Sequence, residues 1–270
     1  MHQRFMKLTE IWIYPVKSLG GIRLQKANVL PKGLEYDRRY MLVDENNRFI
    51  TQRVFPQLAL FKLTLDGNVF TVAHGNDTID LPKQPELNDK LTTVTIWDDA
   101  VEAVELDQKY NQWFTDRAGI QCKLIFFPEG NERPVDKDFA KNNEQVSLAD
   151  GYPFLIIGQS SLDELNTRLE VSVPMNRFRP NFVFEGGKPF EEDNWGDIKI
   201  GGNGFTGLKL CARCVLTTVN QETGQMGNEP LATLSRFRKV GSKVNFGQNL
   251  VARDHLEVNE GDTIKVESFQ

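Results

Sequence analysis

Short stretches that suit β-strands, separated by turn-forming residues, fill most of the first 120 residues of this chain. The runs Asp44-Glu45-Asn46-Asn47 and Asp66-Gly67-Asn68 are typical of hairpin turns. Many short strands at such close spacing favour a barrel or a strongly bent sheet. The strands that we expect in this half are residues 8–15, 22–30, 39–44, 58–65, 69–74, 93–97 and 100–106.

The second half shows the same kind of pattern after a break. Residues 128–146 are charged and rich in turn formers, so we interpret them as a surface connection between two halves. Strands are then expected at residues 152–158, 181–186, 197–202, 205–210, 215–219, 249–253 and 262–268. The fold that we predict is mainly β with a few helices (α+β), in two barrel-like domains over residues 1–120 and 121–270.

Three helices are expected outside these strands. Residues 107–118 place Tyr110, Trp113 and Phe114 on one helical face. Residues 160–170 begin with Ser161 and Glu164 in a capping-box pattern, followed by leucines that share a face. The third helix, short, is expected within residues 230–238.

Composition excludes several classes of protein. The chain has 270 residues, 40% of them hydrophobic, which is enough for a large core. A net charge of -5 argues against a general nucleic-acid binder. Three cysteines are too few for a disulfide framework, and the sequence shows neither a signal peptide nor an apolar run long enough to cross a membrane. We therefore expect a cytoplasmic protein that binds neither nucleic-acid polymers nor a membrane.

Two of the cysteines, Cys211 and Cys214, lie three residues apart. A redox pair usually opens a helix, whereas the β-branched residues 215–219 favour a strand. A zinc site needs four ligands, but Cys122 and the three histidines lie far away in sequence. One thiolate bound to another metal and a small buried apolar cysteine are the remaining alternatives.

Several basic or polar residues lie in segments that suit an anion. Lys17 and Ser18 precede two glycines, a pattern that fits a phosphate but also an ordinary turn. Arg38 interrupts an apolar strand, and Arg179 precedes a proline that favours extended backbone. A guanidinium held in this way can bind a phosphate bidentately or form a structural ion pair. The remaining candidates are Asp150 and Gly151, in a turn before a buried strand, and Asn181 at the start of another.

Taken in order, these segments resemble the MOSC family, named for the C-terminal domain of molybdenum cofactor sulfurase. YPVKSLGGI, GLEYDRRYMLVD and TQRVFPQLA resemble the N-terminal β-barrel domain of that family. ADGYPFLI, RFRPNFVF, CARCVLTTVNQETG, FGQNLVAR and EGDTIKV resemble the MOSC domain itself. The resemblance covers nearly the whole chain and is greatest to the branch that contains the amidoxime-reducing components.

The resemblance implies a molybdenum–molybdopterin cofactor. It assigns the protein ligand of the metal, and with it the catalytic role, to Cys214, and it leaves Cys211 outside the ligand set. The residues that it places around the pterin and its phosphate are Lys17, Ser18, Arg38, Asp150, Gly151, Arg179 and Ala212. Asn181, Gln248 and Asn249 also match family motifs. Pyridoxal phosphate binding is a weaker expectation, which belongs to the family as a whole.

The activity implied by this branch is reduction of small N-hydroxylated compounds to amines. No further cysteines exist to hold an iron–sulfur cluster, so we expect the electrons to come from a separate protein of ferredoxin or flavoprotein type. The alternative is a carrier that binds molybdopterin, or handles its sulfur, without turnover. A protein that has lost the cofactor is disfavoured, because a cluster of unpaired cations is costly without an anion.

Overall fold

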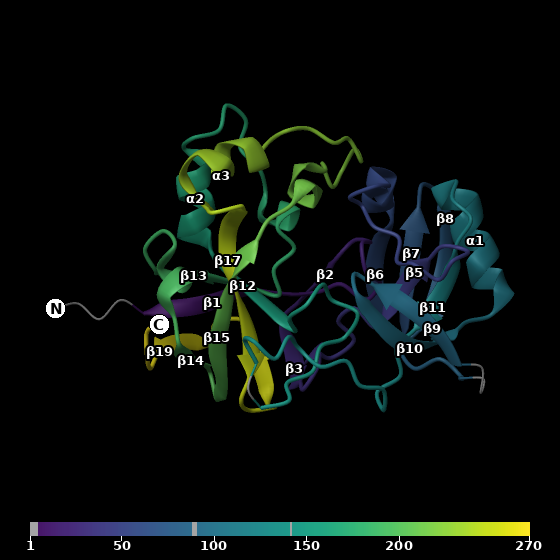
Figure 1. The fold of residues 1–270 in the computed structure, drawn as a ribbon, viewed down its shortest axis with the longest axis horizontal. Coiled ribbons are helices and arrows are strands. Elements are labelled where there is room, and N and C mark those ends of the chain that lie inside the picture. The colour runs from purple at the N-terminus through teal and green to yellow at the C-terminus, as the bar shows by residue number, and fades with distance from the viewer. Residues whose placement is uncertain (1–4, 88–90, 141) are drawn as a thin grey trace.

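The first strand of the chain, β1 (Met6–Ile13), is one strand of a β-barrel whose other strands come from the second half of the sequence. The structure, a computed structural model, describes residues 5–87, 91–140 and 142–270. Two β-rich lobes lie side by side, and both β1 and the C-terminus belong to the lobe on the left of Figure 1. Because β1 pairs with strands near residues 183 and 264, the two halves of the sequence are interleaved.

The left-hand lobe is a closed seven-stranded barrel, since its sheet returns from the last strand to the first. The order is β12 (Phe154–Gly158), β13 (Phe182–Glu185), β1, β19 (Thr263–Val266), β14 (Asp197–Ile200), β15 (Asn203–Ala212) and β17 (Lys243–Ala252). Neighbouring strands are antiparallel, except β12 and β13. The barrel is filled by large apolar side chains, among them Phe154, Phe182 and Phe205, which pack ring against ring.

The right-hand lobe contains two smaller sheets and one helix. The first sheet has the order β5 (Tyr40–Val43), β11 (Lys123–Phe126), β10 (Asp99–Glu105) and β9 (Leu91–Ile96). The second consists of β6 (Lys62–Asp66), β7 (Val69–His74) and β8 (Asp77–Pro82). Helix α1 (Gln108–Ala118) packs beside β11. The mainly β prediction, with two barrel-like lobes, is confirmed.

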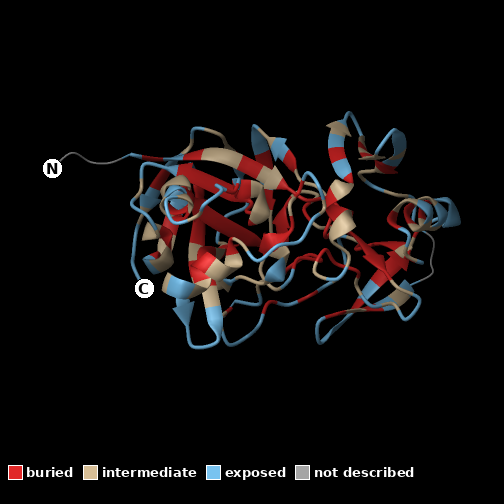
Figure 2. Cartoon of the chain, turned by 90° about the horizontal axis from the view of Figure 1, so that it is seen from above, coloured by how far each residue is buried: buried red, intermediate tan, exposed pale blue. Residues whose placement is uncertain are grey.

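Short strands form further pairings. β2 (Ile22–Leu24) pairs with β1, while β3 (Lys26–Leu30) pairs with both β4 (Gly33–Leu34) and β18 (Glu257–Asn259). β16 (Lys239–Val240) pairs with β17. One hydrophobic core cluster contains residues from both lobes, and the buried segments run from one lobe into the other in Figure 2. The division at residue 120 stays a prediction.

The three predicted helices form, although one begins for a different reason. Asp107 caps α1 by accepting a hydrogen bond from the backbone N–H of Lys109, and Gly119 ends it in a left-handed conformation. α2 (Gln159–Asn166) begins after Gly158, so the capping box expected at Ser161 is wrong. The Ser161 hydroxyl instead donates to the buried carboxylate of Glu192. α3 (Leu231–Phe237) lies within the predicted range.

Three predictions of local structure are wrong. Residues 215–219, expected as a strand, contain a 3-10 helix over Val215–Thr218. Thr217 and Thr218 donate their hydroxyls to backbone carbonyls three residues earlier, and these local bonds replace the pairing of a strand. Similarly, Pro56–Leu60 is a 3-10 helix that contains the first residues of the predicted strand 58–65, where a proline fits the first turn. The connection 128–146 is not wholly at the surface, since it buries Arg133, Val135 and Val146.

Candidate functional site

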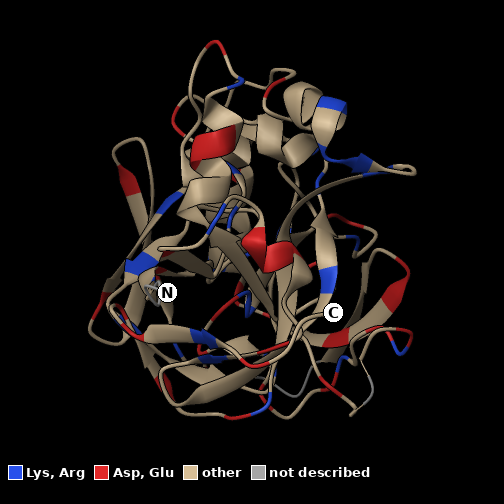
Figure 3. Cartoon of the chain, turned by 90° about the vertical axis from the view of Figure 1, so that its left-hand side faces the viewer, with Lys and Arg blue, Asp and Glu red and all other residues tan. Residues whose placement is uncertain are grey.

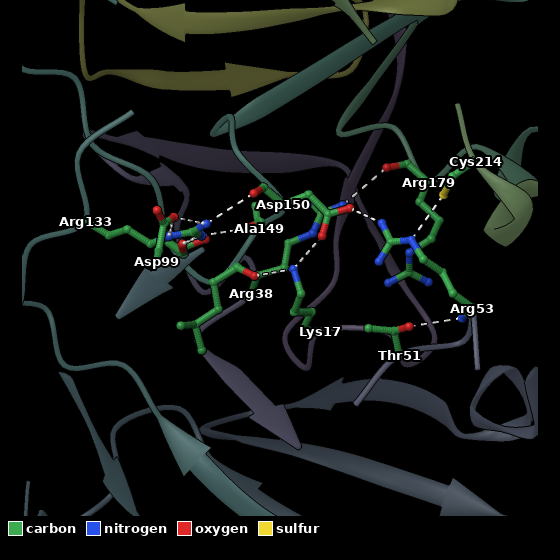
Figure 4. Close-up of polar contacts among 12 residues, drawn as sticks. Lys17, Arg38, Thr51, Arg53, Asp99, Arg133, Ala149, Asp150, Arg179 and Cys214 are labelled. Atoms are coloured by element: carbon green, nitrogen blue, oxygen red, sulfur yellow. Dashed lines mark hydrogen bonds and ion pairs between the residues drawn. The ribbon is translucent and has the colours of Figure 1, made fainter. Parts of the chain in front are cut away.

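Cys214 lies where the chain leaves the rim of the barrel. Strand β15 ends at Ala212, and Cys214 then precedes the 3-10 helix in extended backbone conformation. The Nε of Arg53 donates to its sulfur over 3.1 Å (Figure 4). Arg53 comes from the turn after residue 50, so the sulfur of one lobe faces a guanidinium of the other. A cation that donates to sulfur stabilises negative charge there.

Asp150 joins this arginine to Lys17. Its carboxylate accepts hydrogen bonds from the Nζ of Lys17 over 2.7 Å and from the Nη2 of Arg53 (Figure 4). Partial burial opposes ionisation, but the two cations outweigh it and hold the pKa of Asp150 far below its usual range. The Asp150 side chain is 53% exposed, so it still faces the open space of the site.

Lys17 is nearly enclosed. Its Nζ also donates to the backbone carbonyl of Leu148 over 2.7 Å, and only 5% of the residue is exposed. Burial lowers the pKa of Lys17 to about 8, although Asp150 favours the charged form. The ammonium is therefore positioned by the protein before any ligand binds.

Arg38 and Arg179 share the ring of Tyr14. The centres of their guanidinium groups lie 4.4 and 4.1 Å from the centroid of the ring. Arg38 is paired with the buried carboxylate of Asp37 over 2.6 Å and donates to the side chain of Asn181 over 3.3 Å. Arg179 donates to the carbonyl of Leu19, and burial lowers its pKa to about 10. Arg38 is thus paired with a carboxylate, whereas Arg179 is held by a backbone carbonyl.

Strained backbone is concentrated here. Ser18, Arg38 and Arg179 have φ angles of 68°, 49° and 55°, in the left-handed region that L-residues rarely adopt. Each costs about 1–2 kcal/mol, and such residues persist where the surroundings hold them, most often at functional sites. Three of the residues selected from the sequence are therefore held in costly conformations around one space.

That space is a cavity of about 590 Å³ between the lobes, and every residue singled out from the sequence for the site lines it, except Gln248. The residues predicted from the sequence that line it are Lys17, Ser18, Arg38, Asp150, Gly151, Arg179, Asn181, Ala212, Cys214 and Asn249. Gln248 is excluded, because it is fully buried and donates to the carbonyl of Trp195. The side-chain oxygen of Asn181 accepts hydrogen bonds from Arg38 and from the backbone N–H of Leu155.

Sequence reasoning missed four residues of this cavity that carry its chemistry: Arg53, Trp97, Lys209 and Arg213. Arg53 lies in the family motif TQRVFPQLA, but the resemblance assigns no role to it. Arg213 donates to the sulfur of Cys211 over 2.9 Å and to the carbonyl of Phe178. Cys211 lines the cavity as Cys214 does, but it also packs against an apolar cluster that contains residues of α2 and α3.

The charge of the cavity differs from the charge of the chain. Among the described residues that line it, six are basic and one, Asp150, is acidic. Elsewhere basic and acidic residues are interspersed, as in the side view of Figure 3. A local excess of cations in a protein with a net charge of -5 fits an anionic ligand.

The donor set fits a metal that brings most of its own ligands. Within residues 5–87, 91–140 and 142–270 no group of three or more His, Cys, Asp and Glu side chains is arranged to hold a metal ion. Two cysteines, Cys211 and Cys214, line the cavity instead, and soft sulfur ligands suit a metal already coordinated by sulfur. The buried cations beside it suit a phosphate on the same ligand. The residues present therefore fit a molybdenum–pterin cofactor.

Comparison with known proteins agrees with this architecture. Residues 5–121 match the MOSC N-terminal beta barrel domain, and residues 143–265 match the MOSC domain. The chain belongs to the MOSC family. The resemblance noted in the sequence is thus confirmed, and the site described above is formed from both matched segments.

The relatives differ in what their names describe. Mitochondrial amidoxime-reducing component 1 of Mus musculus is 32% identical over 97% of this chain and 82% of its own length. Molybdenum cofactor sulfurase of Oryza sativa subsp. japonica is 30% identical over 95% of this chain but only 34% of its own length. Among solved structures, the YUAD protein from Bacillus subtilis has 12% identity and a TM-score of 0.47, covering 98% of this chain and 97% of that one.

One further property concerns membranes. Among the residues described, none of the helices is both long enough and apolar enough to span a bilayer.

Proposed function

We propose that this chain is a molybdenum-dependent reductase that converts small N-hydroxylated compounds to the corresponding amines. The observation that carries the proposal is one cavity in which the sulfur of Cys214 lies among buried cations. The name of the 32% identical mouse relative, an amidoxime-reducing component, supports the class of substrate. The three cysteines are free thiols, which suits a reducing compartment such as the cytoplasm.

The protein's part in this function is to hold and orient the cofactor. Cys214 would bind the molybdenum through its sulfur, and Lys17, Ser18, Arg38 and Arg179 would hold the pterin and its phosphate. Asp150, Gly151 and the backbone near Ala212 would complete the pocket. When bound, the cofactor supplies two-electron chemistry at the oxygen atom of the N–O group.

Ion pairs within the protein prepare the cavity for this role. Asp37 keeps Arg38 in place, and Asp150 keeps Lys17 and Arg53 in place, before any anion arrives. The cations therefore need little rearrangement to receive a phosphate. The electrons would arrive from a separate protein of ferredoxin or flavoprotein type, as expected from the sequence.

A second candidate function is cofactor binding without turnover. The match to a molybdenum cofactor sulfurase over 95% of this chain favours it, because that protein is named for handling the cofactor. The same cavity would serve both functions, so only measurement of reduction separates them.

The test compares three proteins made in a host that synthesises the cofactor: the parent, Cys214→Ala and Cys211→Ala. We expect near-stoichiometric molybdenum and pterin in the parent. Cys214→Ala should lose molybdenum at least about ten-fold, whereas Cys211→Ala, the matched control, should stay within about two-fold. Metal is measured by mass spectrometry, and pterin by fluorescence after release.

The outcomes separate the two functions. Reduction of an amidoxime or a hydroxylamine by the loaded parent, with a competent electron donor, supports the reductase. A loaded protein that reduces neither compound favours the carrier. A Cys214→Ala protein that keeps molybdenum and reduces at the parent rate contradicts the assignment of the ligand.

A further inference from the structure

Trp97 occupies an unusual position at the edge of the cavity. It lies in the two-residue turn between β9 and β10, where Ile96 pairs with Asp99. Its φ angle is 55°, a conformation that in hairpin turns normally favours glycine or asparagine. Neither the turn nor the core explains a large aromatic residue here, because 48% of Trp97 is exposed.

The indole is held in place on two sides. The guanidinium of Arg53 lies 4.6 Å from the centroid of the ring, and Phe49 meets it edge to face at 5.1 Å. The same Arg53 donates to the sulfur of Cys214. The indole of Trp97 is therefore held in place, and Arg53 contacts both this ring and the candidate metal ligand Cys214.

Two hollows meet at Trp97. One is the cavity of about 590 Å³ that contains Cys214. The other is a neighbouring hollow of about 450 Å³, most of whose lining is apolar. Its apolar lining residues are Phe49, Ile50, Val54, Phe55, Trp97 and Ile120. Val54 is 70% exposed, so this hollow opens to solvent.

Because Trp97 lines both hollows, one substrate can place its polar group in one hollow and its apolar part in the other. A polar N-hydroxyl group belongs beside the cations and the sulfur, whereas an apolar ring system is favoured against Trp97 and the apolar hollow. A flat aromatic ring beside an indole gains stacking in addition to burial. An aliphatic compound with the same polar group gains much less binding energy from this surface, because it cannot stack.

We propose that Trp97 determines substrate specificity by packing against the ring of aromatic N-hydroxylated substrates, whose substituents extend into the apolar hollow. This inference rests on the proposed function. It names the substrate class of the site as flat aromatic amidoximes rather than small aliphatic ones.

The experiment measures kcat/KM of the loaded enzyme for benzamidoxime and for acetamidoxime. The proteins compared are the parent, Trp97→Ala, Trp97→Phe and Leu91→Ala. Leu91 is a matched control, because it is an exposed apolar residue at the other end of the same strand and lines neither hollow. We expect Trp97→Ala to lower the benzamidoxime-to-acetamidoxime ratio about ten-fold, Trp97→Phe to lower it about two- to three-fold, and Leu91→Ala to leave it unchanged. A ratio in Trp97→Ala within two-fold of the parent overturns the proposal.

A binding measurement keeps the test independent of turnover. Benzamide, a neutral aromatic amide of similar shape, is titrated into the metal-free parent and into Trp97→Ala, and binding is followed by isothermal titration calorimetry. Saturable binding to the parent that is at least about ten-fold weaker in Trp97→Ala supports the role of Trp97, even if the parent reduces neither amidoxime and the proposed function fails. Equal affinity in both proteins, or no binding to the parent, overturns it.

Discussion

The Nε of Arg53 lies 3.1 Å from the Sγ of Cys214, although 161 residues separate the two in sequence. The same guanidinium donates to Asp150 and stacks on Trp97. One side chain from the N-terminal half therefore contacts the candidate metal ligand, the carboxylate of the pocket and the aromatic wall. The sulfur is placed by both lobes, which explains why its surroundings cannot be inferred from the second half alone.

Arg53→Gln should weaken the metal site while leaving the fold intact. The substitution removes the donor to Cys214 and one of the two cations on Asp150, and loss of such a supporting contact typically costs ten- to a hundred-fold in metal affinity or activity. We expect molybdenum content to fall at least about ten-fold and the melting temperature to change little. Metal analysis and thermal unfolding measure the two effects.

Arg117→Gln is the matched control for this substitution. Arg117 also stacks on a tryptophan, Trp113, and pairs with the exposed carboxylate of Asp77, but it lies outside the cavity. It should retain the parent molybdenum content. If Arg53→Gln retains it as well, the contact to Cys214 has no role in holding the metal.

Asp37→Ala should destabilise the protein strongly. Asp37 is 1% exposed, and it accepts from the backbone N–H of Tyr14 over 2.8 Å and from Arg38 over 2.6 Å. Removing it leaves a buried guanidinium without its carboxylate, which costs about 3–5 kcal/mol. Urea unfolding of the metal-free protein should show a loss of this size. Asp77→Ala, which breaks an exposed pair, should cost less than about 1 kcal/mol, and equal losses in the two variants would contradict the prediction.

Ser18→Gly should separate stability from cofactor binding. Ser18 has a φ of 68°, and glycine adopts that conformation at lower cost, so the free energy of unfolding should rise by up to about 1 kcal/mol. The same change removes a hydroxyl from the cavity, so molybdenum content should fall. Asn47→Gly, at a φ of 58° in a turn outside the cavity, should leave molybdenum content unchanged. Urea unfolding and metal analysis decide, and unchanged molybdenum in Ser18→Gly would remove Ser18 from the proposed binding set.

The strands and helices were predictable wherever the local pattern agreed with the tertiary environment. Helix α1 has both an apolar face and a capping aspartate, so its range was predicted within one residue. The strand predicted at residues 215–219 was wrong, because two threonine hydroxyls donate to nearby backbone carbonyls and these local bonds replace strand pairing. The position of β1 in the barrel was not predictable either, since its partners lie about 170 and 260 residues further along the chain.

The candidate site was predictable only in part. Lys17, Arg38 and Arg179 were selected as anion-binding residues, and they meet in one cavity. Arg53 was missed because an arginine in a polar turn resembles a solvated side chain, and its partners are distant in sequence. Trp97 was missed because it was expected to end a strand, whereas its strained turn is visible only in three dimensions.

Glu192 is a buried carboxyl group that does not line the cavity, and its effect on stability depends on pH. It is fully buried, and it accepts from the backbone N–H of Gly158 over 3.0 Å and from the hydroxyl of Ser161 over 2.9 Å. Burial raises the pKa of Glu192 to about 7, because these hydrogen bonds only partly offset the loss of solvation. Asp193 and Arg238, which pair beside it, nearly cancel one another in charge.

Glu192→Gln should therefore stabilise the protein at alkaline pH and leave it unchanged at acidic pH. A raised pKa in the folded state means that the folded protein holds this proton more tightly than the unfolded chain. The stabilisation by the protonated group is complete below about pH 4.5 and is lost as pH rises through about 7, a total of about 3 kcal/mol. Glutamine stays neutral throughout, so the difference in free energy of unfolding between variant and parent should grow from near zero at pH 4 towards about 3 kcal/mol at pH 8. Urea unfolding across this range measures it, and a difference that does not vary with pH would show that Glu192 does not titrate in this window.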